Sequence, residues 1–566
     1  MKRRIILIFV TFAAIIFFRT TNLSAFEPKI DVSNSEVYYY LILGYDAERE
    51  GKWEKAIDYY NKALSYDTAS SHIKMLLSSV LLRTGDIEEA ISLAEDILRS
   101  DPKYVPALMF LGELYNSQKK TVDAITVYKK VLRIQPDNQE ASLFLSLLYA
   151  SRKEYNEAVE ILEKLVKSSP DNLMAIYYLG VLLTEKGDLD EAIKYFNMAA
   201  EQRPNFDAAY YNLGLIFEQK DEMEKAVENY NRAILLNPHN LQARERLGQI
   251  YFKQKDTGKA IEQYEEISNQ IPINIDIHIN LGVLYFEDKQ YDKAIEEFRI
   301  VLQDRPENIS IRYYLALALE EMERYTEAIS ELRKIIQADP KHLGAFLHLG
   351  IIYNKTDKED EAIKVYQEIL DFEKDKPEIY LYLSSSYIKK KDYQNAEEII
   401  RKALERFDKN DDLYFNLAVV MEKTNRFDEM VKYLKKTIEL NPKHAEALNY
   451  MGYSYAERGI NLEEALGLVK KALEIKPESG YILDSLGWIY FKLGKKEEAL
   501  EFLLKAAELT KNDAVIMEHI GDVYIAFGNR DKAIEYYLKS LESETESEDE
   551  GLKDRVSRKI ESIKNK

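Results

Sequence analysis

Seven histidines and many paired carboxylates are the side chains here that could do acid–base or metal chemistry. No two histidines show the His-x-x-x-His spacing with a glutamate that zinc proteases use. Phosphate-binding Gly-x-x-x-x-Gly-Lys-Ser/Thr loops and Gly-x-Ser-x-Gly elbows do not occur either. Acidic pairs such as Glu88-Glu89 and Glu463-Glu464 fall where helices are expected to begin, and there they complement the helix dipole. We expect no catalytic residue, no cofactor and no metal, and hence no enzyme.

The composition excludes further classes of site and partner. The 566 residues include no Cys, which excludes disulfides and thiolate metal sites. The formal net charge of −20 repels phosphate backbones, so nucleic acid is not an expected partner. Tyrosine is unusually frequent, with 41 Tyr against 2 Trp, and its placement therefore needs an explanation.

The first residues have the layout of a secretory signal. Lys2, Arg3 and Arg4 precede an apolar run from Ile5 to Phe18, which is too short to span a bilayer as a stable helix. Small residues then lead up to Ala25. We predict a signal peptide over residues 1–25, an N-terminal linker over 26–35 and an exported chain. The alternative is an uncleaved anchor, which would be the only membrane contact.

Small residues and prolines recur every 34 residues. The small residues lie at Gly44, Ser78, Gly112, Ser146, Gly180, Gly214, Gly248, Gly282, Ala316, Gly350, Ser384, Ala418 and Gly452, and after one inserted residue at Gly487 and Gly521. Ten of the 13 prolines mark another position of the same repeat, for example Pro204 and Pro238. The chain is therefore one unit copied about fifteen times over residues 36–547, and its length does not indicate several compact domains.

Each copy predicts two helices. In residues 207–240, the apolar positions Tyr210, Leu213, Gly214 and Phe217 recur at helical spacing, and a second stripe follows at Ala226, Tyr230 and Ala233. A polar turn separates the stripes, and Asn237-Pro238 ends the second helix. Gly214 and Ala226 are expected to be small because the two helices cross there.

This pattern resembles the tetratricopeptide repeat (TPR) family. The family's aromatic, Leu-Gly, aromatic, Ala, aromatic and Pro positions correspond to Tyr210, Leu213-Gly214, Phe217, Ala226, Tyr230 and Pro238. The resemblance implies an all-α fold in which antiparallel helix pairs stack into a right-handed superhelical solenoid. It also implies a concave groove lined largely by the first helix of each pair.

Two features near the C-terminus carry further expectations. The block from Asn449 to Trp488 resembles one found in exported TPR proteins of Gram-negative bacteria, which implies a periplasmic or outer-membrane-associated location. Residues 548–566 combine the end of an acidic run with apolar residues at helical spacing. We predict an acidic link and a helix that caps the solenoid. The alternative is a docking helix for a partner.

The expected groove residues lie two and three positions before each small residue. In repeats one to five both residues of the pair are apolar or aromatic where a solvated surface would favour polar residues, and exposed apolar surface usually marks a binding site. The row ends in polar pairs at Asp484-Ser485 and Glu518-His519. The candidate partner-binding residues are Met75, Met109, Phe110, Phe144, Tyr177, Tyr178, Tyr211, Asn212, Asn280, Tyr313, Tyr314, Tyr382 and Asn416.

Two functions are consistent with these features. The first is a non-enzymatic scaffold or adaptor that binds protein or peptide partners in the bacterial cell envelope through the groove. The second is an accessory role in exopolysaccharide export or glycan handling, because tyrosine-rich grooves can stack on sugar rings. A further alternative is that part of each groove pair only packs between adjacent first helices. The sequence leaves the oligomeric state and the identity of the partner open.

Overall fold

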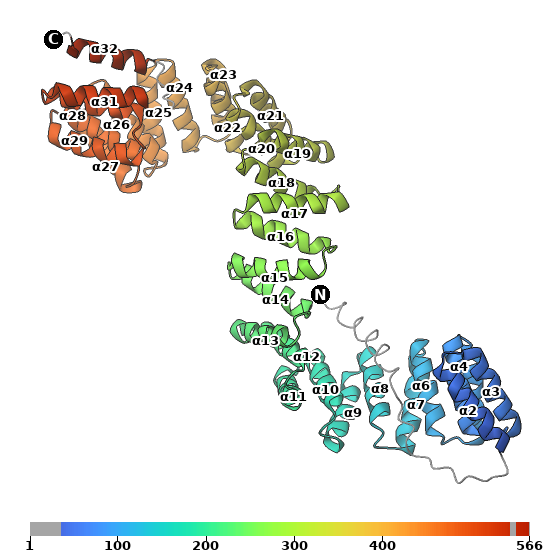
Figure 1. Ribbon diagram of the computed structural model, residues 1–566. Coiled ribbons are helices and arrows are strands. Elements are labelled where there is room, and N and C mark those ends of the chain that lie inside the picture. The colour runs from blue at the N-terminus through green and yellow to red at the C-terminus, as the bar shows by residue number, and fades with distance from the viewer. Residues whose placement is uncertain (1–34, 544–550, 565–566) are drawn as a thin grey trace. The chain divides into compact units, whose positions relative to one another are not determined.

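The computed structural model describes residues 35–543 and 551–564, and every regular element within them is an α-helix. The helices follow one another in short antiparallel pairs (Figure 1). The prediction of an all-α solenoid is confirmed. The expected signal peptide and most of the linker and acidic link lie outside the described residues. No helix in the described part of the chain is long and apolar enough to cross a membrane.

The chain divides into two compact units at Leu284/Tyr285. In the first unit, the helices are α2 (Ser35–Arg49), α3 (Trp53–Tyr66), α4 (Ser71–Thr84), α5 (Ile87–Ser100), α6 (Val105–Ser117), α7 (Thr121–Ile134), α8 (Gln139–Ser151), α9 (Tyr155–Ser168), α10 (Leu173–Lys186), α11 (Leu189–Gln202), α12 (Asp207–Gln219), α13 (Met223–Leu236), α14 (Leu241–Lys253) and α15 (Thr257–Gln270). Helix α16 (Ile275–Glu287) contains the division. Even-numbered labels mark the first helix of a repeat until α30, so α6 and α7 form the third repeat.

The second unit continues the same alternation of first and second helices. Its helices are α17 (Tyr291–Asp304), α18 (Ile309–Glu321), α19 (Tyr325–Ala338), α20 (Leu343–Lys355), α21 (Glu359–Phe372), α22 (Pro377–Lys389), α23 (Tyr393–Leu404), α24 (Asp411–Lys423), α25 (Phe427–Leu440), α26 (Ala445–Glu457), α27 (Leu462–Ile475), α28 (Gly480–Lys492), α29 (Lys496–Leu509), α30 (Ala514–Ala526), α31 (Arg530–Glu542) and α32 (Leu552–Lys564). Helix α32 follows the fifteenth repeat and packs Leu552, Val556 and Ile560 into the core of the last repeats.

Capping side chains start many of the first helices. Asn138, Asn172 and Asn240 each accept a hydrogen bond from the backbone N–H three residues on, at 2.9–3.0 Å. These bonds satisfy donors that a helix start leaves unpaired. A histidine, His342 or His444, does the same through Nδ1 in two later repeats.

A left-handed residue makes the turn inside every repeat. It lies seven residues after the small residue and has φ between 53° and 97°. Glycine, which adopts this conformation without a steric penalty, occupies only six of the fifteen turns. The other nine are Lys119, Lys153, Asp221, Lys255, Lys289, Glu323, Asp357, Lys391 and Asn425. The left-handed backbone conformation therefore recurs in every turn, although the residue type predicts it only where the residue is glycine.

In many repeats the small residue of the first helix makes room for an aromatic ring of the second helix. A Cβ added at Gly112 would lie 2.6 Å from Cζ of Tyr128, and one added at Gly214 would lie 2.6 Å from Cδ1 of Tyr230. Both tyrosines are fully buried. Repeats that carry Ser or Ala at this place have a smaller or aliphatic partner, such as Leu162 opposite Ser146. Glycine is thus needed where a tyrosine must pass beneath the first helix.

Candidate functional site

The candidate groove residues are mostly half-buried. Tyr382 is exposed, and the other twelve are intermediate: Met75, Met109, Phe110, Phe144, Tyr177, Tyr178, Tyr211, Asn212, Asn280, Tyr313, Tyr314 and Asn416. Such side chains bury one face and leave another open to solvent. They can therefore support the fold and still contact a ligand.

One recurring contact explains the buried face of the second residue in each pair. Phe144 stacks on Tyr128 of the preceding repeat, with ring centroids 5.6 Å apart. Tyr314 stacks on Phe298 at 5.8 Å and Tyr382 on Tyr366 at 5.7 Å in the same register. Packing between repeats therefore accounts for part of each groove side chain, as the alternative interpretation of the row expected.

The first unit brings six candidate residues to one apolar core cluster. Met75, Met109, Phe110, Phe144, Tyr177 and Tyr178 all pack against it. Tyr211 packs against the next cluster along the same unit. The remaining aromatic candidates, Tyr313, Tyr314 and Tyr382, belong to the second unit. The densest apolar part of the row thus lies on α4, α6, α8 and α10, and we call this stretch the apolar groove.

Two of the three candidate asparagines bond within their own unit. Nδ2 of Asn212 donates to the backbone O of Ala208 at 2.8 Å and to the hydroxyl of Tyr177 at 3.2 Å. Nδ2 of Asn416 donates to the backbone O of Asp412 at 3.0 Å. In Asn212 both amide N–H groups have acceptors, so the amide oxygen is the group left to meet a ligand. In Asn416 one amide N–H has an acceptor, and the other N–H is left together with the amide oxygen.

The polar end of the row does not form an open surface, contrary to the sequence expectation. Asp484, Ser485, Glu518 and His519 are all buried. Arg555 donates from Nε and Nη2 to the two carboxylate oxygens of Glu518, at 2.8 and 2.6 Å. The reason is that α32 contributes cations to the carboxylates of α30. The position of a residue within its own repeat does not predict a partner from a helix outside the repeats.

Lys559 completes this ionic network. Its Nζ lies 2.6 Å from both carboxylate oxygens of Asp522 and 2.8 Å from Oε1 of Glu518. The Tyr537 hydroxyl donates to Oδ1 of Asp522 at 2.6 Å. Two carboxylates and a tyrosine therefore hold one lysine, which lies 5.6 Å from the tyrosine ring centroid.

His519 lies beside this network. Its ring stacks on Trp488 with centroids 4.0 Å apart, and its Nδ1 lies 2.8 Å from Oδ1 of Asp484. Burial alone would lower the pKa of His519, but the carboxylate of Asp484 raises that pKa above its ordinary value. Asp484 and Trp488 of the block from Asn449 to Trp488 thus contact a buried histidine of the next repeat.

Tyrosine hydroxyls reach the carboxylates of first helices in other repeats as well. Tyr60 donates to Oε2 of Glu48 at 3.0 Å, and Tyr230 donates to Oε2 of Glu218 at 2.8 Å. Arg246 of the next repeat lies 3.5 Å from Oε1 of Glu218. The glycine beneath which each ring passes is what brings its hydroxyl to the first helix.

The third repeat departs from this pattern, and its departure is not predictable from the apolar pairs of the sequence. The buried hydroxyl of Tyr128 has no hydrogen-bond partner among the described residues. Glu113, next to Gly112, and Glu140, one turn before Phe144 on α8, both raise the pKa of this hydroxyl, after the larger effect of burial. The signal in the sequence is an acidic residue directly after the small residue, at a position outside the apolar pairs.

Glu113 has an unusual electrostatic environment. Its side chain keeps contact with solvent, yet the surrounding protein displaces enough water to raise the pKa of its carboxyl to about 7. The charge of Glu140 adds to this increase. Burial also raises the pKa of Glu140.

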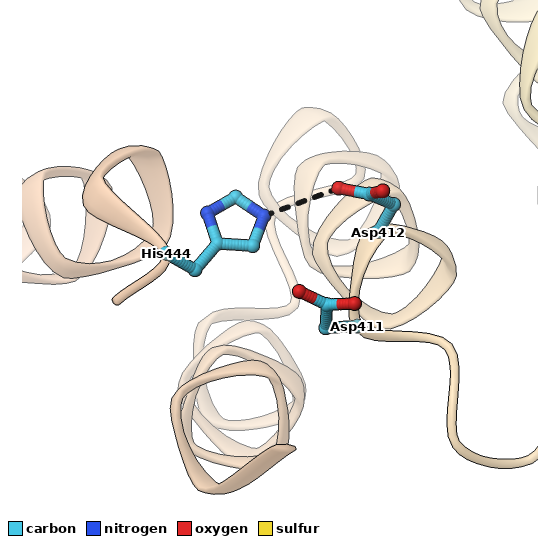
Figure 2. A group of neighbouring side chains, drawn as sticks. All are labelled: Asp411, Asp412 and His444. Atoms are coloured by element: carbon cyan, nitrogen blue, oxygen red, sulfur yellow. Dashed lines mark ion pairs between the residues drawn. The ribbon is translucent and has the colours of Figure 1, made fainter. Parts of the chain in front are cut away.

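One group of potential metal ligands occurs in the described residues, on α24 and at the start of α26. Figure 2 shows the imidazole of His444 facing the carboxylates of Asp411 and Asp412. The nearest ligand atoms of the three side chains lie within 4.8 Å of one another. Nε2 of His444 lies 3.4 Å from Oδ1 of Asp412, and the histidine is buried.

The hydrogen bonds of this group favour capping over metal binding. Nδ1 of His444 accepts from the backbone N–H of Ala447 at 3.2 Å, so a neutral ring carries its proton on Nε2 and offers no free lone pair there. Oδ2 of Asp411 already accepts from Asn441 at 2.6 Å. Six repeats earlier, Asn237 and Asn240 donate to Asp207 in the same register. The group is a repeated contact between successive repeats, and the absence of a metal site stays a prediction.

The stacked helix pairs define the class of the protein, an all-α repeat solenoid. Family models of repeat proteins match most of its length. The N-terminal ARM repeat of tetratricopeptide repeat protein 21 matches residues 39–276, and the N-terminal TPR region of psidin matches 284–422. Models described as tetratricopeptide repeat match 411–444, 480–513 and 514–546. Together these matches support a tetratricopeptide repeat protein.

No curated protein matches the chain. The crystal structure of the APC/C hetero-tetramer Cut9–Hcn1 is 16% identical with a TM-score of 0.38, covering 81% of this chain and 96% of that one. Yeast Tom70 is 17% identical with a TM-score of 0.38, covering 82% and 96%. YrrB, a TPR protein with an unusual peptide-binding site, is 24% identical with a TM-score of 0.30, covering 32% and 95%. These TM-scores are too low to support inferences about partners.

Proposed function

We propose that this protein is a non-enzymatic scaffold that binds extended segments of protein partners through the apolar groove. The observation that carries the proposal is the run of half-buried Met, Phe and Tyr side chains on α4, α6, α8 and α10. Contiguous apolar surface of this kind is typical of interaction sites, and Tyr and Met suit adaptable protein contacts. The core beneath the groove fixes one face of each ring, which lowers the entropy lost on binding.

We also propose that the scaffold works in the envelope of a Gram-negative bacterium. The basic and apolar N-terminal segment and the block from Asn449 to Trp488 support this location. Fractionation of cells that carry the full-length chain with a C-terminal tag tests it directly. Recovery in the periplasmic or outer-membrane fraction is expected, whereas recovery only in the cytosol would contradict the location without affecting the groove.

The groove itself is tested by selection from a random peptide library displayed on phage. The wild-type chain is expected to enrich a family of related peptides. A double variant, Met109→Ala with Tyr178→Ala, should lose this enrichment because both side chains face the groove while their neighbours keep the core filled. Circular dichroism and a thermal melt establish that the variant is folded.

The matched control is Tyr195→Ala on the second helix α11, because Tyr195 is also half-buried but lies outside the groove row. It should retain peptide enrichment. Equal enrichment by the wild type and the groove variant would contradict the proposal. Absence of peptide enrichment together with groove-dependent binding to a glycan array would favour the glycan-handling alternative instead.

A further inference from the structure

Two carboxylates on the first helices of the apolar groove lie near enough to one buried tyrosine hydroxyl to act on it electrostatically. Gly112 on α6 lies against Cζ of Tyr128, and Glu113 follows it in the chain. Phe144 on α8 stacks on the same tyrosine ring. Glu140 lies one helical turn before Phe144 and therefore shares its face of α8. We call Glu113, Glu140 and Tyr128 the acidic subsite.

The acidic subsite has polar groups that the described chain leaves unsatisfied. The hydroxyl of Tyr128 is fully buried and has no hydrogen-bond partner among the described residues. Within the same part of the chain, neither carboxylate forms an ion pair with a lysine, arginine or histidine. Both carboxylates are exposed, so a ligand can reach them. A buried hydroxyl without a partner is costly, and such groups are few in native proteins.

Other repeats show what occupies the equivalent positions. Asp522 directly follows Gly521, as Glu113 follows Gly112, and it accepts from the Tyr537 hydroxyl while Lys559 pairs with both of its oxygens. In the ninth repeat, Glu320 lies at another position, four residues after Ala316, and is paired with Lys355 at 3.0 Å. The chain itself supplies a cation to these carboxylates, but it supplies none to Glu113 and Glu140.

We propose that the acidic subsite binds a lysine or arginine side chain of the partner segment. The inference rests on the proposed function, since it assigns the chemistry of one residue of the segment that the groove holds. The cation takes the place that Lys559 has beside Asp522, and it pairs with the exposed carboxylates of Glu113 and Glu140. Met109 and Phe110 on the same helix provide apolar surface for a neighbouring side chain of the partner. The partner is thus a segment in which a basic residue adjoins an apolar one.

The test compares three chains in the same random-peptide selection. These are the wild type, the subsite variant Glu113→Gln with Glu140→Gln, and the control Glu157→Gln with Glu201→Gln. The control removes the same charge from two exposed positions on the second helices α9 and α11. Peptides from the wild type and the control are expected to carry Lys or Arg at one fixed position beside an apolar residue. The subsite variant should select peptides without that preference.

A second measurement links the basic residue to the subsite. One selected peptide is synthesised with its Lys and with acetyl-lysine, and binding to each chain is measured by fluorescence anisotropy. The wild type should lose about tenfold in affinity on acetylation, and the subsite variant should lose little, because the coupling requires both charges. A thermal melt of each chain verifies folding.

The outcomes separate this inference from the proposed function. If the wild type selects no peptides at all, the groove proposal fails. If it selects peptides that depend on Met109 and Tyr178 but show no basic position, the groove remains and the acidic subsite assignment is overturned. A basic preference that persists in the subsite variant overturns the assignment as well.

Discussion

The third repeat and the fifteenth repeat place the same chemical groups at the same positions of the helix pair, with opposite results. Both have a carboxylate directly after the small glycine and a tyrosine that passes beneath it. In the fifteenth repeat α32 supplies Arg555 and Lys559; Glu518 is buried and Asp522 is half-buried. In the third repeat no cation is supplied by the described chain, and the carboxylates stay exposed.

This difference teaches that a repeat position does not have a fixed role. The same location becomes structural when a neighbouring element provides the complementary charge, and it becomes a candidate binding site when none does. Four predictions test this comparison, from the largest expected effect to the smallest.

Removing the carboxylate that anchors α32 should have the largest effect. Glu518→Ala leaves Arg555 without its bidentate partner and is expected to reduce the stability of the C-terminal end by about 2 kcal/mol. This lies below the 3–5 kcal/mol typical of fully buried pairs, because both cations are partly exposed and can return to water. Hydrogen exchange should show lost protection in 552–564. Unchanged protection there would contradict the role of this ion pair.

Supplying a cation to the third repeat should close its subsite. Phe144→Arg imitates Arg246, which occupies the equivalent position three repeats later and lies beside Glu218. The new guanidinium should compete with a basic peptide for Glu113 and weaken its binding on the order of tenfold, equivalent to about 1.4 kcal/mol. Phe144→Leu is the control for the lost ring stacking. Equal binding to the Arg and Leu variants, measured by anisotropy, would refute the competition.

The two repeats should also respond to pH in opposite ways. The raised pKa of His519 means that its pair with Asp484, near Glu518 and Asp522, stabilises the fold fully below about pH 6.5 and loses this contribution as pH rises through the higher folded-state pKa. Glu113, beside Glu140 and Tyr128, has a pKa of about 7, so binding of a basic peptide should strengthen as pH rises through that value.

Two variants separate these titrations. Asp484→Asn should remove the pH dependence of the hydrogen-exchange protection factors in α30 and leave peptide binding unaffected. Glu113→Gln should flatten the pH profile of peptide binding between pH 6 and 8 and leave α30 unaffected. If both profiles changed together in either variant, the two repeats would not be independent in the way the comparison requires.

The smallest effect should come from the turns. Lys119 has φ of 60°, so Lys119→Gly is expected to stabilise the third repeat by about 1 kcal/mol by removing the left-handed strain of a residue with a Cβ. Lys120, the next residue, has φ of −82°, and Lys120→Gly should give no such gain. Thermal melts of the two variants distinguish the cases. Equal shifts would show that the turn is not strained.

Much of the fold could be predicted because the same structural pattern occurs in about fifteen copies. Helix periodicity, the small residue and the closing proline recur at one spacing, so errors in single copies average out. The apolar groove residues were found by the same offset, and their half-buried state agrees with an interface that also packs between repeats. Whether they bind a partner stays a prediction.

The remaining site residues could not be found by an offset, because their roles depend on partners from other elements. Glu518 and His519 have the register of groove residues, yet α32 covers them. Glu113 resembles any other exposed acid until the buried hydroxyl of Tyr128 is placed beside it. His444 and its two aspartates similarly resemble ligands until the bond from Ala447 determines the protonation of the ring.

The sequence by itself determined the class of structure: the helical pairs, their number and spacing, and the positions at which the first helix needs a small residue. Only the tertiary structure decided which polar groups are satisfied within the chain and which are left for a ligand. The physical reason is that helix formation and apolar burial depend on the pattern of residues along one segment, and this pattern is visible in the sequence. Satisfaction of a charge or a hydroxyl depends on which atoms of another segment lie within about 3 Å of it.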